Sequence, residues 1–378
     1  MSTRWSRREF VQWMGYSSLA SAALGSPLLA AEGKPSTASF AYVAAKDGAE
    51  EGIHGYAVRR GWEKLQVVES SRPVALTLAP SRRFLYAVNE VDSHKGLPVG
   101  TIEAFAIGQD GRLTLLNRRE LALSATMPRH AAVTPDGRNL VVAVSGGGAY
   151  NVLPIGEDGS LGRVSSMLKE IGVERESGSS QAQPRMVAFD TAGRVVSVDG
   201  GADRLNVLSV GDEGIRAHAR AGLSAGCRAS QVAMHPAGER LYVMQGEAIS
   251  CHPYDATAGR VSEPTQHLSI AGAMEGPGTM AVPPSGRFLY ACQRGGGVAA
   301  WGMGSRGDGI SRPLGLQVAA MGELHAIEIA PDGRSVMGVS RNKGLIQRAE
   351  LDPGTGRLSA GDVVAQVNSP SSLVVLYS

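Results

Sequence analysis

A short phrase recurs along this 378-residue chain: an apolar strand, a tight Pro/Gly turn closed by arginine, and a second apolar strand. Its six copies lie within residues 76–87, 132–142, 189–194, 234–243, 282–290 and 329–334. Successive turns are about 45 to 56 residues apart, which is the usual length of one four-stranded blade of a β-propeller. The repeat therefore predicts an all-β ring of similar blades.

A second set of loops predicts the number of blades. Glycine-containing loops between outer strands occur seven times, at Gly61, Gly111, Gly159, Gly214, Gly259, Gly309 and Gly356. Because the first turn occurs only six times, we expect the chain termini to interrupt the seventh copy. Residues 371–377 would then supply the innermost strand of the blade that begins at residues 40–44, which closes the ring and removes exposed sheet edges. Residues 38–378 are thus predicted to form one all-β domain, a seven-bladed β-propeller of four-stranded antiparallel blades with about 49 residues each.

The first 31 residues have the features of an export signal rather than of the fold. The run Ser6–Val11 contains a twin-arginine motif, and a mildly apolar stretch follows it and ends near Ala31. A membrane anchor is the rival interpretation, but Gln12, Gly25 and Pro27 interrupt the stretch, which is too short for a span of about 20 apolar residues. We therefore expect residues 1–31 to be a cleaved twin-arginine signal peptide. The mature protein would be periplasmic or secreted and would have no membrane span.

The charge balance argues against a nucleic-acid partner. The whole chain has 37 basic and 35 acidic residues, and removing the leader's three arginines and one glutamate leaves 34 of each. A mature domain without net charge lacks the basic excess that binding to DNA or RNA normally requires.

The cysteines and histidines predict neither a metal site nor another cofactor. Cys227, Cys251 and Cys292 lie in or beside expected strands, where a small buried apolar residue is the ordinary interpretation. A bridge between Cys227 and Cys251 stays open as an alternative, because spacing alone does not establish disulfide geometry. The chain contains no Cys-x-x-Cys, no His-Glu-x-x-His and no acidic calcium loop.

Arginines gather at one predicted end of the ring. In each blade the innermost strand begins, and the second strand ends, beside the mouth of the central channel, where loops of a rigid scaffold commonly bind ligands. Six blades place an arginine there: Arg72, Arg129, Arg185, Arg228, Arg294 and Arg341. Guanidinium groups bind carboxylate and phosphate through paired hydrogen bonds, so the set indicates an anionic small-molecule ligand. The alternative is that these arginines only cap strand ends or form surface ion pairs with acids such as Glu90, Asp92, Asp199 and Glu247.

His130 is the titratable residue with the most suggestive neighbours. It follows Arg129 at the predicted mouth, in the blade after Glu90. A histidine base, a carboxylate that orients it and a guanidinium that holds an oxyanion would be sufficient for metal-free hydrolysis of an activated ester. The alternative is a strand histidine that bonds to the backbone. His325 is a weaker candidate at the same end.

Several segments resemble the seven-bladed lactonase family, whose members include bacterial 6-phosphogluconolactonases and fungal carboxymuconate cyclases. The best matches are Pro128–Arg138, Val144–Gly148, Pro154–Leu161 and Phe84–Glu90. The resemblance covers essentially all of residues 38–378.

The family resemblance implies a lactone ring that is opened or closed at the channel mouth, without metal, by His, Glu and Arg side chains. Glu90, His130 and Arg294 lie at positions that match the family's pattern. Elsewhere the chain departs from it. Arg228-Ala-Ser-Gln231 occupies the place of a Gly-Pro-Arg-His run, and Gln183-Pro-Arg185 replaces a His-rich segment.

The sequence therefore predicts an exported lactone hydrolase that opens an anionic or sugar-derived lactone, as 6-phosphogluconolactonases do. In this prediction His130 activates water, Glu90 orients the histidine, and Arg129 stabilises the carbonyl oxygen. The remaining arginines bind the substrate anion: Arg72, Arg185, Arg228, Arg294 and Arg341.

The second functional prediction is a non-catalytic periplasmic propeller that binds an anionic ligand or a protein partner on the same face. We expect a monomer in either case. The long connection Leu168–Gln183 is either a lid on the site face or a loop without function, and the sequence does not distinguish the two.

Overall fold

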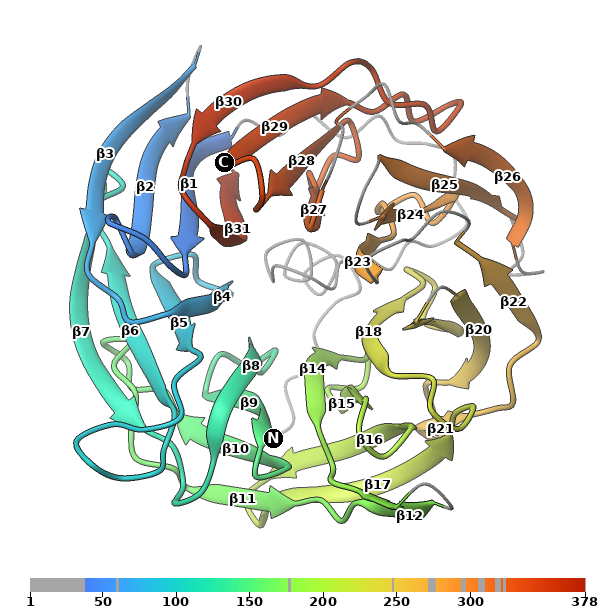
Figure 1. The fold of residues 1–378 in the computed structure, drawn as a ribbon, viewed down its shortest axis with the longest axis horizontal. Coiled ribbons are helices and arrows are strands. Elements are labelled where there is room, and N and C mark those ends of the chain that lie inside the picture. Colours follow the sequence, from blue (N-terminus) through green and yellow to red (C-terminus); the bar gives the residue numbers. More distant parts are fainter. Residues whose placement is uncertain are drawn as a thin grey trace.

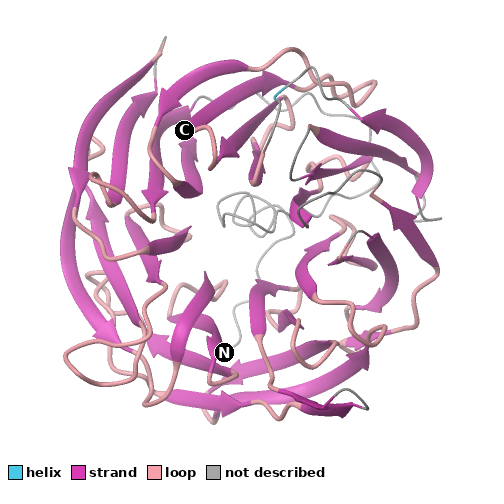
Figure 2. Ribbon diagram, viewed as in Figure 1, coloured by secondary structure: helices cyan, strands magenta, loops and turns pink. Residues whose placement is uncertain are grey.

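The computed structural model describes residues 38–58, 61–175, 178–246, 248–270, 277–293, 297–304, 310–316, 321 and 324–377. The predicted signal peptide lies outside these ranges, as do Glu247, Arg294 and Gly309. Within them, antiparallel sheets are arranged around a common axis (Figure 1; Figure 2). No helix in the described ranges has the length and apolarity needed to cross a bilayer.

Seven of the sheets in the described part are blades of the ring, so the predicted number of blades is confirmed. Blade 1 contains β31 (Pro370–Tyr377), β1 (Ala38–Ala45), β2 (Gly52–Val58) and β3 (Trp62–Val68). Blade 2 contains β4 (Pro73–Leu78), β5 (Phe84–Asn89), β6 (Thr101–Ile107) and β7 (Leu113–Glu120). Blade 3 contains β8 (Thr126–Val133), β9 (Asn139–Gly146), β10 (Ala149–Pro154) and β11 (Ser166–Lys169). Blade 4 contains β14 (Pro184–Phe189), β15 (Val195–Asp199), β16 (Arg204–Gly211) and β17 (Gly214–Gly222).

The last three blades follow the same order from the axis outward. Blade 5 contains β18 (Ala229–Met234), β19 (Arg240–Gln245) and β20 (Ala248–Asp255), and both β21 (Arg260–Val261) and β22 (Gln266–Ser269) pair with β20. Blade 6 contains β23 (Pro277–Ala281), β24 (Phe288–Gln293), β25 (Val298–Met303) and β26 (Ile310–Leu316). Blade 7 contains β27 (Ala326–Ile329), β28 (Ser335–Ser340), β29 (Leu345–Glu350) and β30 (Asp362–Gln366).

The two ends of the chain close the ring within one blade, as predicted. Strand β31 pairs antiparallel with β1 in a register that sets Ala41 opposite Val375 and Val43 opposite Leu373. Both strands are almost fully buried. The C-terminal strand therefore provides the innermost strand of blade 1 and covers the edge of β1 that would otherwise be unpaired.

Neighbouring blades are joined by a repeated aromatic–glycine contact. In blade 1 the Tyr42 hydroxyl donates to the Gly111 carbonyl of blade 2 at 2.9 Å, and the Phe40 ring lies where a Gly111 side chain would be. Gly111 has a left-handed φ of 79°, which favours glycine for a second, independent reason. The same arrangement joins Phe84 and Tyr86 to Gly159, and Phe288 and Tyr290 to Gly356.

The three cysteine thiols are free, so the possible Cys227–Cys251 bridge is not formed. Cys251 and Cys292 are buried, as expected of small apolar residues, and Cys227 is partly exposed.

The long connection between blades 3 and 4 contains a small hairpin, β12 (Val173–Arg175) with β13 (Gly178–Ser180). This hairpin lies at the outer edge of the ring (Figure 1). The Ser180 hydroxyl donates to the Gly201 carbonyl of blade 4 at 2.8 Å and so attaches the hairpin to that blade.

Candidate active site

The innermost strands begin, and the second strands end, on one edge of the ring, which we call the rim. Most of the inner strands show a register shift just after they begin, for example between Pro128 and His130 in β8 and between Pro184 and Met186 in β14. Proline has no N–H for the ladder, so a strand start or a bulge is where it fits. The extra residues in these two bulges are Arg129 and Arg185, and both belong to the rim.

Glu90 is the centre of a charged group at the rim. It follows β5 directly and is only 1% exposed. Its carboxylate forms ion pairs with Lys46 on one oxygen and with Arg129 on the other. A buried carboxylate requires such partners, because the free energy of leaving it unpaired would be large.

Lys46 is a site residue that the sequence analysis missed. It follows β1 just as Glu90 follows β5, so the two residues hold equivalent positions in adjacent blades. Its side chain is 14% exposed. Its position at the end of a second strand could have identified it from the repeat. However, blade 1 is divided between the two termini, so the ends of its strands are hard to recognise in the sequence.

Arg185 extends the charged group into blade 4. Its Nη2 donates to the Gln183 side-chain oxygen at 2.7 Å. Burial lowers the pKa of the Arg185 guanidinium, the charge of Arg129 lowers this pKa further, and the charges of Asp199 and Glu90 oppose the shift. The two guanidiniums are therefore near enough to repel one another, and an anion bound between them would relieve that repulsion.

The Nε atoms of Arg129 and Arg185 have unused hydrogen-bonding capacity. Both are buried and have no hydrogen-bond partner among the described residues. Buried donors are normally satisfied by protein, water or ligand. Lys46 and Arg129 pair with one carboxylate and Arg185 lies near it, an arrangement with a local positive excess that suits a bound anion.

His130 lies between blades rather than against Glu90. It is 3% exposed, and the Val187 N–H of blade 4 approaches its Nδ1 at 3.5 Å. Other inner strands accept a backbone N–H from the next blade in the same way, through Ser372 (from Leu76, 3.1 Å), Gln231 (from Met280, 2.5 Å) and Thr279 (from Ile327, 2.8 Å). His130 therefore takes part in a repeated contact between blades, and the Glu90 carboxylate lies against Lys46 and Arg129.

The other predicted arginines are spread around the rim. Arg72 has a left-handed φ of 46°, forms an exposed ion pair with Asp47 at 2.8 Å, and donates from Nε to the Glu90 carbonyl at 3.3 Å. Arg341 donates from Nε to the Pro370 carbonyl at 3.4 Å. Arg228 is exposed in blade 5, and Arg294 lies outside the described residues.

Other parts of the described chain offer less for catalysis. No group of three or more His, Cys, Asp or Glu side chains in it is arranged to hold a metal ion. A hollow beside Leu314 and Asp352 lies near the turns of blades 6 and 7, on the edge of the ring opposite the rim.

The sequence matches a known class of protein. The sequence model of a family described as "Lactonase, 7-bladed beta-propeller" matches residues 40–376. The chain therefore belongs to the seven-bladed β-propeller lactonase family, as its sequence motifs predicted.

Individual relatives are distant. The chain is 24% identical over 263 residues to the 6-phosphogluconolactonase of Bacillus subtilis, a match that covers 66% of this chain and 72% of that protein. It is 26% identical over 239 residues to an uncharacterized protein of Staphylococcus saprophyticus, covering 60% of this chain and 66% of that protein.

Solved structures confirm the fold. The periplasmic gluconolactonase of Pseudomonas aeruginosa superposes with a TM-score of 0.78 at 23% identity, covering 89% of this chain and 98% of that one. A Bacteroides fragilis protein gives a TM-score of 0.79 at 21% identity, covering 91% and 100%.

Proposed function

We propose that this protein is a lactone hydrolase that opens an anionic or sugar-derived lactone at the mouth of the propeller channel. The observation that carries the proposal is the group of Lys46, Arg129 and Arg185 around the buried Glu90, in a chain of the lactonase family. The names of the Bacillus 6-phosphogluconolactonase and the Pseudomonas gluconolactonase support a sugar acid as the source of the lactone.

Opening a lactone requires a water proton to be removed and an oxyanion to be stabilised. Water adds to the carbonyl carbon, the ring C–O bond then breaks, and the products are a hydroxyl and a carboxylate. We assign oxyanion binding to Arg129 and substrate-anion binding to Arg185, because the buried Nε donors of both point to an acceptor supplied by the ligand.

We assign the removal of the water proton to Glu90 rather than to His130. Glu90 is the carboxylate that lies beside the two arginines, whereas Nδ1 of His130 faces a backbone N–H of the next blade. His130 holds β8 against β14, the strand that presents Arg185.

The test is a panel of aldonolactones and muconolactones with the purified mature chain, in which acid release is followed by titration at constant pH. We expect turnover above the spontaneous rate for at least one lactone that carries a carboxylate or phosphate. No turnover on the whole panel would contradict the proposal. If anions nevertheless raise the melting temperature, the non-catalytic binding propeller becomes the better account.

We also propose that the chain is exported by the twin-arginine route. The motif Ser6–Val11 supports this, and the Pseudomonas neighbour is named as periplasmic. Replacing Arg7 and Arg8 by lysine should retain the full-length precursor in the cytoplasm. Equal periplasmic yield of the variant and the wild type would contradict export by this route.

A further inference from the structure

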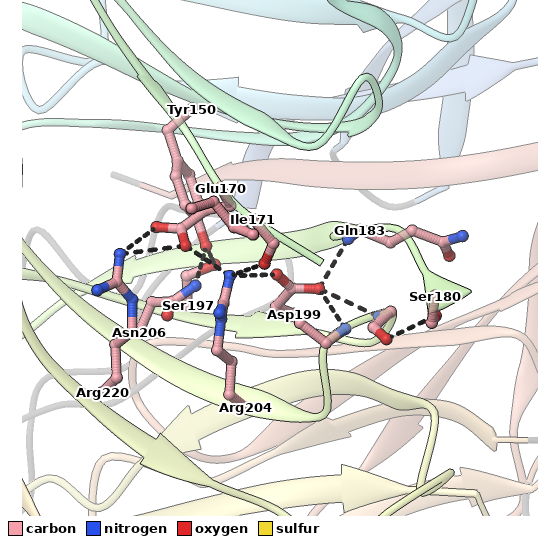
Figure 3. Close-up of polar contacts among 12 residues, drawn as sticks. Tyr150, Glu170, Ile171, Ser180, Gln183, Ser197, Asp199, Arg204, Asn206 and Arg220 are labelled. Carbon is pink, nitrogen blue, oxygen red and sulfur yellow. Dashed lines mark hydrogen bonds and ion pairs between the residues drawn. The ribbon is translucent and has the colours of Figure 1, made fainter. Parts of the chain in front are cut away.

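Blade 4 contains a buried carboxylate that the proposed chemistry does not use. Asp199 ends β15 and is fully buried. Its Oδ1 accepts three backbone N–H groups, from Gln183 at 2.7 Å, Gly201 at 3.1 Å and Ala202 at 2.9 Å (Figure 3). One oxygen thus links the residue before β14 to the turn that follows β15.

The other oxygen of Asp199 faces a second charged layer. Arg204 approaches Oδ2 at 3.4 Å and also donates to the Glu170 carboxylate at 2.5 Å and to the Ile171 carbonyl at 2.9 Å (Figure 3). Arg220 reaches the same glutamate at 3.3 Å. Glu170 follows the outer strand of blade 3, so this layer fixes Asp199 relative to the neighbouring blade.

The same residues hold Arg185. Gln183, whose backbone is bound by Asp199, accepts Arg185 Nη2 on its side-chain oxygen at 2.7 Å. Gly200, next to Asp199, lies beside the guanidinium, since a side-chain carbon at Gly200 would be in van der Waals contact with Arg185 Nε at 3.4 Å. One edge of the guanidinium is thereby held, while the buried Nε has no hydrogen-bond partner in the part of the chain that the structure describes.

We propose that Asp199 and Gln183 are positioning residues that orient Arg185 for anion binding at the rim. The inference rests on the proposed function in so far as the anion belongs to a lactone. Arg185 is partly buried and repelled by Arg129, so without this support its side chain would be expected to turn toward solvent. A fixed guanidinium loses less conformational freedom when it binds a carboxylate or phosphate.

The experiment measures the binding of inorganic phosphate by calorimetry, together with KM and kcat on the best lactone of the panel. Gln183→Met removes the acceptor at nearly constant size. Asp199→Asn sets an amide N–H₂ against Arg204 or the backbone donors. Each variant should weaken phosphate binding by about fivefold or more and raise KM, with kcat within about twofold of wild type, because one charge-assisted contact is no longer aligned.

Asp190→Asn is the matched control. Asp190 is a fully buried carboxylate at the other end of β14, and it also accepts backbone N–H groups and pairs with an arginine, Arg194, at 3.0 Å. We expect Asp190→Asn and Asp199→Asn both to lower the melting temperature. Only Asp199→Asn should also weaken phosphate binding.

The outcomes separate this inference from the proposed function. Three results would each overturn the inference. In the first, both folded variants bind phosphate with an affinity within twofold of wild type. In the others, Asp190→Asn weakens phosphate binding equally, or the wild type binds no phosphate. Phosphate binding with the expected variant pattern but without turnover of any lactone would support the inference and contradict the proposed function.

Discussion

Glu328 shows how far the environment of one residue alters its chemistry. It lies in β27 of blade 7, is 8% exposed, and accepts the Val375 N–H of blade 1 on one oxygen at 3.4 Å. Its other oxygen has no partner among the described residues. Burial raises the pKa of this carboxyl to about 8, and the hydrogen bond from Val375 opposes the shift only in part. The side chain therefore remains protonated at neutral pH, at the contact where the ring closes.

This shift predicts a pH dependence of stability. Because the folded pKa lies above the unfolded value of 4.5, the stabilising contribution is complete below about pH 4.5 and is lost as the pH rises toward 8. Between pH 5 and pH 8, the free energy of unfolding of Glu328→Gln should therefore rise relative to that of wild type by up to roughly 4 kcal/mol, as measured by urea unfolding. Parallel stability curves for the two proteins would show that the carboxyl is ionised in the folded state.

Substitutions of Glu90 and His130 should have different effects on activity. Glu90→Gln keeps the shape of the side chain but removes the proposed base, so kcat should fall by about 100-fold or more. His130→Gln should retain kcat within about tenfold, because the side chain contacts the Val187 N–H and not Glu90. Stopped-flow measurement of lactone opening at saturating substrate distinguishes them, and the reverse order of effects would return the role of base to His130.

At the scale of the strand, the bulges explain what the sequence could and could not predict. The motif Pro128-Arg-His130 predicted that this strand start lies at the rim, because the position of the turn relative to the strands is a local property. It did not predict that Arg129 would be the extra residue. The bulge directs Arg129 to the rim and turns His130 between blades, so the charged pair is Glu90–Arg129.

Lys46, and the way in which Asp199 supports Arg185, were missed for a related reason. The position of Lys46 becomes equivalent to that of Glu90 only once β31, from the far end of the chain, completes its blade. Asp199 accepts from Gly201 and Ala202 within its own turn, which is a local pattern. Its link to Gln183, and through Arg204 to Glu170 of blade 3, depends on tertiary structure and leaves no local pattern in the sequence.

The aromatic–glycine contact predicts unequal costs for two glycines. Gly111 and Gly137 both have left-handed φ values, 79° and 75°, but a side chain at Gly137 would meet open space while one at Gly111 would collide with the Phe40 ring. Gly137→Ala should cost about 1 kcal/mol, and Gly111→Ala about 3 kcal/mol or more. Equal losses in chemical denaturation would show that Phe40 moves aside at no cost.

At the scale of the whole molecule, regular repetition made the ring predictable, and differences between blades create the site. Every described blade repeats strand order and turns, so the number of blades and the closure followed from periodicity alone. The charged group occupies blades 1 to 4, whereas blade 5 presents Ser230 and Gly246 at the corresponding rim positions. A repeat does not reveal which blades carry charged side chains at equivalent rim positions.

Closure by β31 predicts that the ring fails as a unit without its C-terminal strand. Ending the chain after Ser369 removes the inner strand of blade 1 and the carbonyl of Tyr377 that accepts from Arg82 at 2.7 Å. Circular dichroism during heating should show no cooperative transition, and size-exclusion chromatography should show aggregates from the exposed edges. A monomer that melts cooperatively near the wild-type temperature would contradict the closure.

We propose that the guanidiniums of Arg129 and Arg185 act together on the substrate at the rim. The most direct test is kcat/KM for lactone opening by the Arg129→Met, Arg185→Met double variant, with folding verified by its melting curve. We predict a fall of about 100-fold or more relative to wild type, since two charge-assisted contacts to the substrate anion and oxyanion are lost. A folded double variant with kcat/KM within threefold of wild type would show that the reaction takes place elsewhere.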